Sequence, residues 1–473
     1  MKSENKNFIY NIVYQLFLYI VPLILTPYIS RVLGANNIGI YSYSYSIVYY
    51  FMLFTLLGIN NYGSRNIARL SNDKKKCSKK FWSIYFLQLF LGIIMLLLYN
   101  LLYIFIIKKY NIIFFINNLF LISAIFDINW LFFGLEKFKI TVVRNAIIKI
   151  FSLILIFALV KNREDLWLYT LIMGLGTLIS QLYLWLILHK YVTYEKVTIK
   201  EIFFNLKSCL ILFIPVLAYS IYRVMDKTMI GTFSSTLELG FYENAEKIIN
   251  IPISFITALG TVMLPHMSKI DKNDAQKIKN EINSSFKLCM CFVVPIVIIL
   301  LLIGKDLAIV YFGSEFEKSG IIIMLLSFTI LFSGIANVIR TNYLIPFELD
   351  KIYVTSTIIG AILNLISNII FIPMHGALGA CIGTLIAEFT VMFYQFIKVR
   401  HKIDTKYFVS CILLFLTKTI FVALPIILIK FIVPNLIIRV VIQIFVSIFM
   451  YFILNYKYIL YDFLGIKKQK RIL

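Results

Sequence analysis

The chain has 473 residues, of which 60% are apolar and 15% are charged, and its formal net charge is +23. This composition excludes a water-soluble fold, because soluble domains carry about 25% charged residues and are only about half apolar. The positive charge does not indicate nucleic-acid binding, because the lysines and arginines gather in connections between apolar runs instead of forming one solvated basic face.

Apolar runs follow one another along almost the whole chain, and each is close to the roughly 20 residues that a helix needs to cross a bilayer. The first run has no small-residue cleavage site, so we expect it to stay in the protein as a helix. We predict an all-α membrane protein of about fourteen transmembrane helices, over residues 8–29, 38–59, 81–107, 112–133, 145–160, 166–189, 208–231, 241–265, 287–304, 319–340, 353–372, 377–398, 407–430 and 436–456.

The connections alternate between rich and poor in cations, which predicts the orientation. Residues 65–80 contain seven lysines and arginines, residues 269–287 contain five, and the tail from Lys457 contains five, whereas the connections between them are poor in cations. Since cations gather on the cytoplasmic side, both termini are predicted to be cytoplasmic. The longest outer connection, 305–318, is too short for an extracellular domain.

Two parts of the chain share a pattern. The first helix reads PLILTPYISRV from Pro22 and the seventh reads PVLAYSIYRV from Pro215, and the following helices open on Gly39-Ile-Tyr and Gly240-Phe-Tyr. This pattern predicts two six-helix bundles of the same orientation, 1–207 and 208–406, followed by two further helices and a basic cytoplasmic tail in 407–473. Chance similarity between apolar helices that contain proline is the alternative.

Charged residues lie within the predicted helices, where each costs about 2.5–3.5 kcal/mol unless it faces water or a partner. Helical spacing places Arg223, Asp226 and Lys227 on one face of the seventh helix. The eighth helix presents another such group, consisting of Glu243, Glu246 and Lys247. These groups predict a polar lumen, although pairs three or four residues apart could instead neutralise each other within one helix.

Further charged residues lie at helix ends or singly. Arg31, Arg65 and Arg340 are placed to line the mouths of the lumen, or alternatively to reach lipid head groups. Asp127 is either a cation site or a buried hydrogen-bonded acid, and Glu388 lies on the twelfth helix. Cations outnumber acids on the candidate lumen surfaces, which favours an anionic guest such as a phosphate-bearing lipid. No metal-ligand spacing and no catalytic residue is predicted.

Three stretches of the chain read ISRVLGANNIGIYS from Ile29, GINNYGSRNIA from Gly58 and DKTMIG from Asp226. These stretches resemble the polysaccharide transporter family, the Wzx-type O-antigen and capsule repeat-unit flippases of the multidrug/oligosaccharidyl-lipid/polysaccharide exporter superfamily. The resemblance extends over nearly the whole chain. It implies two six-helix bundles that form a V around a central cavity, and translocation of undecaprenyl-diphosphate-linked oligosaccharide repeat units from the inner to the outer leaflet by alternating access.

The resemblance also implies a role in O-antigen, capsule or exopolysaccharide biosynthesis at the bacterial cell membrane, without a cofactor. The expected partners are the lipid-linked glycan and the bilayer, with a polysaccharide polymerase and a chain-length regulator as further candidates. By analogy, the cavity cations that meet the diphosphate and sugars are Arg31, Arg65, Arg223, Lys227 and Lys247, to which the charge pattern adds Arg340. Coupling to Na⁺ or H⁺ is left open, with candidate acids Asp127, Asp226, Glu243, Glu246 and Glu388.

Two alternatives stay open. An ion-coupled multidrug exporter of the same superfamily would need an acid-rich cavity for cationic drugs, and the excess of cations argues against it. A polytopic membrane glycosyltransferase or polymerase would need paired acids or metal ligands in a large loop, and the loops are short. The sequence contains no phosphate-binding G-x-x-x-x-G-K-[ST] motif, so we expect a transporter that is neither an enzyme nor an ATP-driven pump.

Overall fold

A computed structural model describes residues 2–105, 111–271 and 274–458, without the side chains of 2–20, 105, 111, 215, 218–219, 221–223 and 457. All regular structure in these ranges is helical. Helices suit a chain in lipid, because a helix satisfies its backbone hydrogen bonds within itself. The chain divides into two compact units, Met1–Gly240 and Phe241–Leu473.

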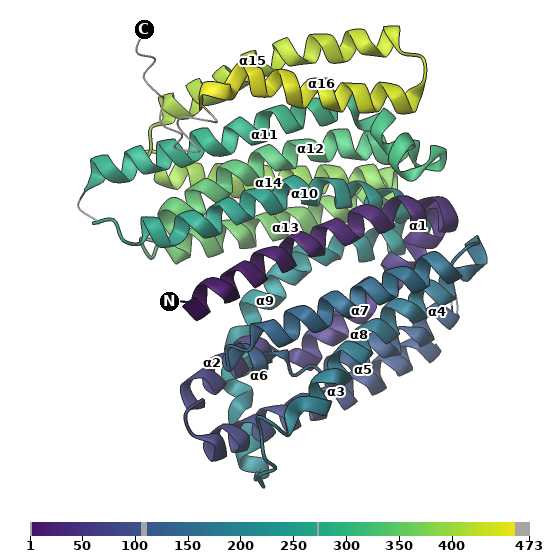
Figure 1. The fold of residues 1–473 in the computed structure, drawn as a ribbon, viewed down its shortest axis with the longest axis vertical. Helices are drawn as coiled ribbons and strands as arrows, with labels where there is room; N and C mark the ends of the chain where they lie inside the picture. The colour runs from purple at the N-terminus through teal and green to yellow at the C-terminus, as the bar shows by residue number, and fades with distance from the viewer. Residues whose placement is uncertain (1, 106–110, 272–273, 459–473) are drawn as a thin grey trace. The chain divides into compact units, whose positions relative to one another are not determined.

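The helices of both units are shown in Figure 1. The first unit contains α1 (Lys2–Leu56), α2 (Ile59–Leu70), α3 (Lys74–Phe105), α4 (Asn111–Ile116), α5 (Asn118–Ile125), α6 (Asn129–Gly134), α7 (Phe138–Leu159), the 3-10 turn η1 (Arg163–Asp165), α8 (Leu166–Leu188) and α9 (Ile199–Phe233). The second unit contains most of α10 (Thr236–Met267), then α11 (Ala275–Phe312), η2 (Ser314–Phe316), α12 (Glu317–Ile339), the π-helical turn η3 (Arg340–Leu344), α13 (Asp350–His375), α14 (Ala377–Val399), α15 (Thr405–Ile432) and α16 (Leu436–Lys457).

Twelve helical stretches among the described residues are long and apolar enough to cross a membrane. One of them, Val21–Leu70, holds the second predicted span and the end of the first, and α9 covers the predicted seventh span in addition to the twelve. The predicted all-α membrane fold is therefore confirmed. The boundary between the two bundles at 207/208 was predicted from the sequence repeat, and it stays a prediction. The division of the chain into compact units is a different one, in which α9 belongs to the first unit.

Gly34 separates the first two predicted spans within α1. Its φ of 76° and ψ of 170° are not helical, and the positive φ is a conformation that glycine adopts without steric cost. The chain therefore changes direction at Gly34, and α1 consists of two helical segments with a break between them.

The helix that follows this break packs closely on the first turn of α10, inside the first unit. A side chain at Gly39 would collide with the Thr236 carbonyl, and one at Gly240 would collide with the Ala35 carbonyl. The Thr236 hydroxyl also donates to Asn36 Oδ1 at 2.7 Å. Both glycines open a helix of the predicted repeat, and the absence of a side chain at each lets the two backbones approach closely.

The predicted span 112–133 is broken into α4, α5 and α6, which leaves backbone carbonyls without helical partners. Gln88 of α3 provides hydrogen bonds to these carbonyls. Its Nε2 donates to the carbonyls of Ala124 (2.8 Å), Ile125 (3.1 Å) and Asp127 (2.8 Å). Its Oε1 accepts from Trp130 Nε1 at 3.1 Å. A single buried amide thus stabilises the break between α5 and α6, as the absence of water in a bilayer requires.

In the second unit, α15 and α16 run side by side (Figure 1) and pack on α11. The rings of Phe286 and Phe408 stack with centroids 3.6 Å apart, which joins α11 to α15. The Tyr451 hydroxyl of α16 donates to the Cys291 carbonyl of α11 at 2.7 Å. The two C-terminal helices are therefore packed into the second unit as part of its fold.

Replacing Gln88 by leucine should lower the free energy of unfolding by about 1–3 kcal/mol or more, because several buried polar groups would lose their partners. Gln443→Leu is the matched control, since Gln443 is also buried but, among the described residues, its side chain donates only to the Ile426 carbonyl. Thermal unfolding of the purified protein measures the difference. Equal losses in the two variants would contradict the role assigned to Gln88.

Candidate functional site

In the first unit, α9 carries the predicted residues Asp226 and Lys227. Asp226 is only 5% exposed, and Lys227 is half-buried. Just beyond them, the Thr228 hydroxyl donates to Ser46 Oγ at 3.0 Å, and Tyr50 is hydrogen-bonded to Thr228 and lies near the Asp226 carboxylate. These contacts fix α9 against the second segment of α1. The acid is therefore held on a packed helix face.

The predicted arginines of the first unit lie at different places. Arg31 is exposed and lies three residues before the break at Gly34. Arg65 is exposed on α2 and forms no ion pair with any other described residue. The side chain of Arg223 lies outside the described part of the structure, although its backbone belongs to α9. Their role as cavity cations stays a prediction.

In the second unit, α10 carries the predicted group of Glu243, Glu246 and Lys247, all partly buried. Lys247 Nζ lies 3.7 Å from Glu243 Oε1, one helical turn away. It also lies 3.5 Å from Asn244 Oδ1. The structure therefore contains the ion pair within one helix that the spacing in the sequence suggested as an alternative. This pair reduces the free-energy cost of keeping both charges inside a membrane helix.

A second polar group of this unit lies on α12 and its neighbours. Ser333 donates to Glu388 Oε2 of α14 at 2.6 Å, and Arg340 Nη2 donates to Asn337 Oδ1 at 2.6 Å. Asn337 Nδ2 donates in turn to the Ile256 carbonyl of α10 at 2.9 Å. Since Ser333, Asn337 and Arg340 are four and three residues apart, they share one face of α12. Glu388 and Arg340 are therefore both positioned by side chains of α12.

The α12 face ends at η3, a π-helical turn that begins with Arg340. The Arg340 guanidinium lies 5.5 Å from the centroid of the Tyr353 ring, within the range of a cation–π interaction. Single π-helical turns are frequent at functional sites. Ser333 and Asn337 were not among the predicted site residues, but their spacing from Arg340 in the span 319–340 was a signal that could have found them.

Asp127 lies in a polar network between α6, α7 and α8 of the first unit. Its Oδ1 accepts from the backbone N–H of Asn129 at 2.9 Å and from Asn129 Nδ2 at 2.7 Å. Asn129 Oδ1 accepts from Arg144 Nη2 at 2.9 Å, and Arg144 acts on Asp127 electrostatically. Asn129 Nδ2 also donates to Gln181 at 3.2 Å.

This network gives Asp127 hydrogen-bond donors and a nearby cation inside the protein. These contacts favour the hydrogen-bonded-acid interpretation, and a coupling role for Asp127 stays a prediction. Arg144, which is 4% exposed, and Gln181 were missed from the sequence. Arg144 was placed in a connection before the span 145–160, whereas α7 begins at Phe138 and carries it within the helix. Gln181 was a polar residue inside an apolar run, which is a usable signal.

The model of the family described as "Polysaccharide biosynthesis protein" matches residues 5–271, more than half of the chain. This chain belongs to the polysaccharide biosynthesis protein family. The resemblance found in the sequence is thereby confirmed. A Shigella dysenteriae protein named as a candidate O-antigen transporter is 26% identical over 387 residues, covering 80% of this chain and 95% of the relative.

Solved structures share the fold of this family member. The lipid II flippase MurJ, in an inward closed conformation, matches with a TM-score of 0.76 over 97% of this chain and 100% of that chain, at 19% identity. An inward-facing multidrug resistance transporter of the MATE family matches with a TM-score of 0.57 over 82% of this chain and 94% of that chain, at 13% identity. At these identities the matches show the fold.

Replacing Arg144 by methionine should lower the free energy of unfolding by about 1–3 kcal/mol, because the side-chain oxygens of Asn129 and Asn145 would lose a buried donor and Asp127 would lose the nearby cation. Adding Asp127→Asn should restore much of this loss, since the charge is removed while an acceptor for Asn129 remains. Thermal unfolding in detergent measures both variants. Lys137→Met, an exposed position before α7, should leave the melting temperature unchanged.

The double variant decides the interpretation. If Arg144→Met and Arg144→Met/Asp127→Asn unfold at the same temperature, Arg144 does not serve to balance the Asp127 charge.

Proposed function

We propose that this chain is a flippase that moves undecaprenyl-diphosphate-linked oligosaccharide repeat units from the inner to the outer leaflet of the bacterial cell membrane. Membership in the polysaccharide biosynthesis protein family supports this proposal. So do the O-antigen transport named for the Shigella relative and the lipid II flipping named for the MurJ structure.

The observation that carries the proposal is the density of charged residues on two consecutive membrane helices. Asp226 and Lys227 lie near the end of α9, and Glu243, Glu246 and Lys247 lie near the start of α10. A charge inside a membrane helix is costly, by about 2.5–3.5 kcal/mol at the bilayer centre, so a group of such charges indicates polar surroundings. A diphosphate and its sugars are a guest that cations and hydrogen-bonding side chains would stabilise.

The mechanism we propose is alternating access. The diphosphate and sugars pass along the charged faces, with Arg31, Arg65, Arg223, Lys227, Lys247 and Arg340 as the candidate cations, while the polyprenyl chain stays in lipid. Outward movement of each negative charge is favoured by about 2.3 kcal/mol per 100 mV of inside-negative potential. The potential could therefore help to drive the step. Coupling to Na⁺ or H⁺ through one of the candidate acids is a further proposal.

The proposed function needs no chemical step on the substrate, so the chain would act as a transporter and not as an enzyme. Both termini would lie in the cytoplasm, as the cation-rich connections predict. A polysaccharide polymerase and a chain-length regulator are proposed as partners because they would use the translocated units.

Deleting the gene in its host tests the function. We expect completed lipid-linked repeat units to accumulate facing the cytoplasm and the surface polysaccharide to disappear, with both restored by a wild-type copy. If the units are never completed, the chain is better interpreted as an enzyme. If the amount of surface glycan is unchanged, the chain is better interpreted as a multidrug exporter.

The charged faces are tested by complementation with Arg223→Ala/Lys247→Ala. This double variant should stay in the membrane at wild-type amounts but should abolish surface glycan, because the diphosphate would lose two candidate cations. Lys402→Ala, on the exposed connection before α15, is the control and should restore glycan fully. Near-normal glycan with the double variant would overturn the assignment of these cations.

A further inference from the structure

A groove of about 430 Å³ lies between α2, α3 and α9 of the first unit. Its lining is basic and partly apolar, and consists of Leu70, Lys76, Lys79, Lys80, Ser83, Lys200, Glu201 and Phe204. These residues belong to the predicted cytoplasmic connection 65–80, to the connection 190–207, or to the helix turns next to them. Residues 190–207 join the predicted spans 166–189 and 208–231 and follow 65–80 by four spans, so they are predicted to lie on the same side of the membrane. The groove therefore lies at the level where a membrane helix meets the head groups.

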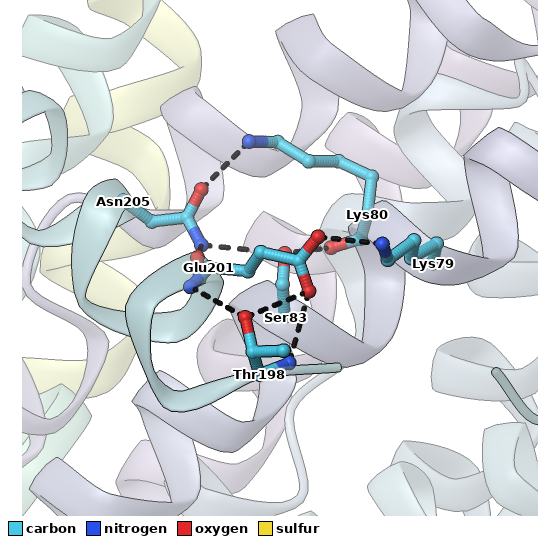
Figure 2. Close-up of polar contacts among 6 residues, drawn as sticks. All are labelled: Lys79, Lys80, Ser83, Thr198, Glu201 and Asn205. Carbon is cyan, nitrogen blue, oxygen red and sulfur yellow. Dashed lines mark hydrogen bonds and ion pairs between the residues drawn. The ribbon is translucent and has the colours of Figure 1, made fainter. Parts of the chain in front are cut away.

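Two of the four lysines are neutralised by acids. Lys79 Nζ lies 2.5 Å from Glu201 Oε1 (Figure 2). This ammonium, together with the backbone N–H of Thr198, lowers the pKa of Glu201 to about 2, so the carboxylate is ionised at neutral pH. Lys76 Nζ lies 3.1 Å from Asp73 Oδ2, and the bonds from Lys76 hold the pKa of Asp73 below its usual range.

The other two lysines have no carboxylate partner among the described residues. Lys80 Nζ donates to Asn205 Oδ1 at 2.6 Å and to the Tyr62 hydroxyl at 3.0 Å, both of which are neutral (Figure 2 shows the first bond). Lys200 is exposed at the start of α9 and forms no ion pair with another described residue. With four lysines against two acids, the groove has an excess of two positive charges.

Lys80 is held in place by buried groups. Asn205 is fully buried, and its Nδ2 donates to the Glu201 carbonyl at 2.9 Å and to Ser83 Oγ at 3.3 Å. The Tyr62 hydroxyl, whose residue is 4% exposed, donates to Asn205 Oδ1 at 2.9 Å. An ammonium fixed in this way loses little side-chain freedom when it meets an anion, which favours binding.

The groove also has an apolar margin. Phe204 is 77% exposed and Ile199 is 73% exposed, and Phe203 beside them contacts Phe90 with ring centroids 5.4 Å apart. A free anion would make no favourable contact with these apolar side chains, whereas the acyl chains of a lipid would pack against them. Basic pockets between membrane helices on the cytoplasmic side are suited to anionic head groups.

We propose that this groove binds an anionic phospholipid, with the phosphate between Lys80 and Lys200 and an acyl chain along Phe204. The lipid would tie α3 to α9 at the predicted cytoplasmic side of the first unit. The residues that line the groove include none of the candidate cations of the glycan path, and the test of the groove does not depend on transport.

Native mass spectrometry of the purified full chain tests the proposal, with phosphatidylglycerol or phosphatidylcholine added to the detergent. The wild-type protein should retain phosphatidylglycerol in preference to the zwitterionic lipid. Lys200→Gln should weaken the retention of phosphatidylglycerol about fivefold, the effect expected of one lysine near an anionic head group. Lys196→Gln, an exposed lysine of the same connection outside the groove, is the matched control and should retain it as the wild type does.

Lys80→Met is a second variant, read together with its melting temperature so that misfolding is recognised, and a folded Lys80→Met protein should also lose phosphatidylglycerol. Equal retention of the two lipids, or equal effects of Lys200→Gln and Lys196→Gln, would overturn the proposal. Displacement of bound phosphatidylglycerol by inorganic phosphate alone would overturn it as well, because the groove would then be a site for free anions.

Discussion

Lipid supplies no hydrogen-bond partners, so the backbone groups within the bilayer must find partners inside the protein. The first unit is organised by this constraint. Where the helix after 111 is interrupted, Gln88 takes three of the freed carbonyls and Trp185 Nε1 donates to the Phe126 carbonyl at 2.9 Å. Trp130, which donates to Gln88, stacks on Phe81 at 5.3 Å in the core. Polar satisfaction and apolar packing thus depend on the same few side chains.

The positions of the membrane helices could be predicted from the sequence because the bilayer sets the length and apolarity of a span. Both properties are visible in about 20 consecutive residues. Their ends could not. α11 begins at Ala275 and α9 at Ile199, well before the apolar runs, because helical hydrogen bonding continues into the polar connection where hydropathy falls. The interruptions at Asn117 and at Phe126–Ile128 were also missed, since they depend on Gln88 and on other partners distant in the sequence.

The candidate site was predictable to the extent that a charge in an apolar run stands out. That rule found Asp127, Asp226 and Lys247, but not the side chains that position them. Arg144 escaped because it was placed in a connection, and uncharged partners such as Ser333 are common in membrane helices. Which charges serve structure and which serve the guest is decided by packing. Asp127, near Arg144, fits the first description, and we propose the second for the charged ends of α9 and α10.

The most direct test of the account is translocation by the purified protein reconstituted in vesicles. An undecaprenyl-diphosphate-linked oligosaccharide with a fluorescent sugar would be incorporated in both leaflets, and an impermeant quencher would report how much becomes accessible from outside. The account predicts that the protein makes nearly all of the label accessible, while protein-free vesicles protect the inner half. If vesicles with the protein protect the label as well as empty ones do, the chain does not flip this class of lipid.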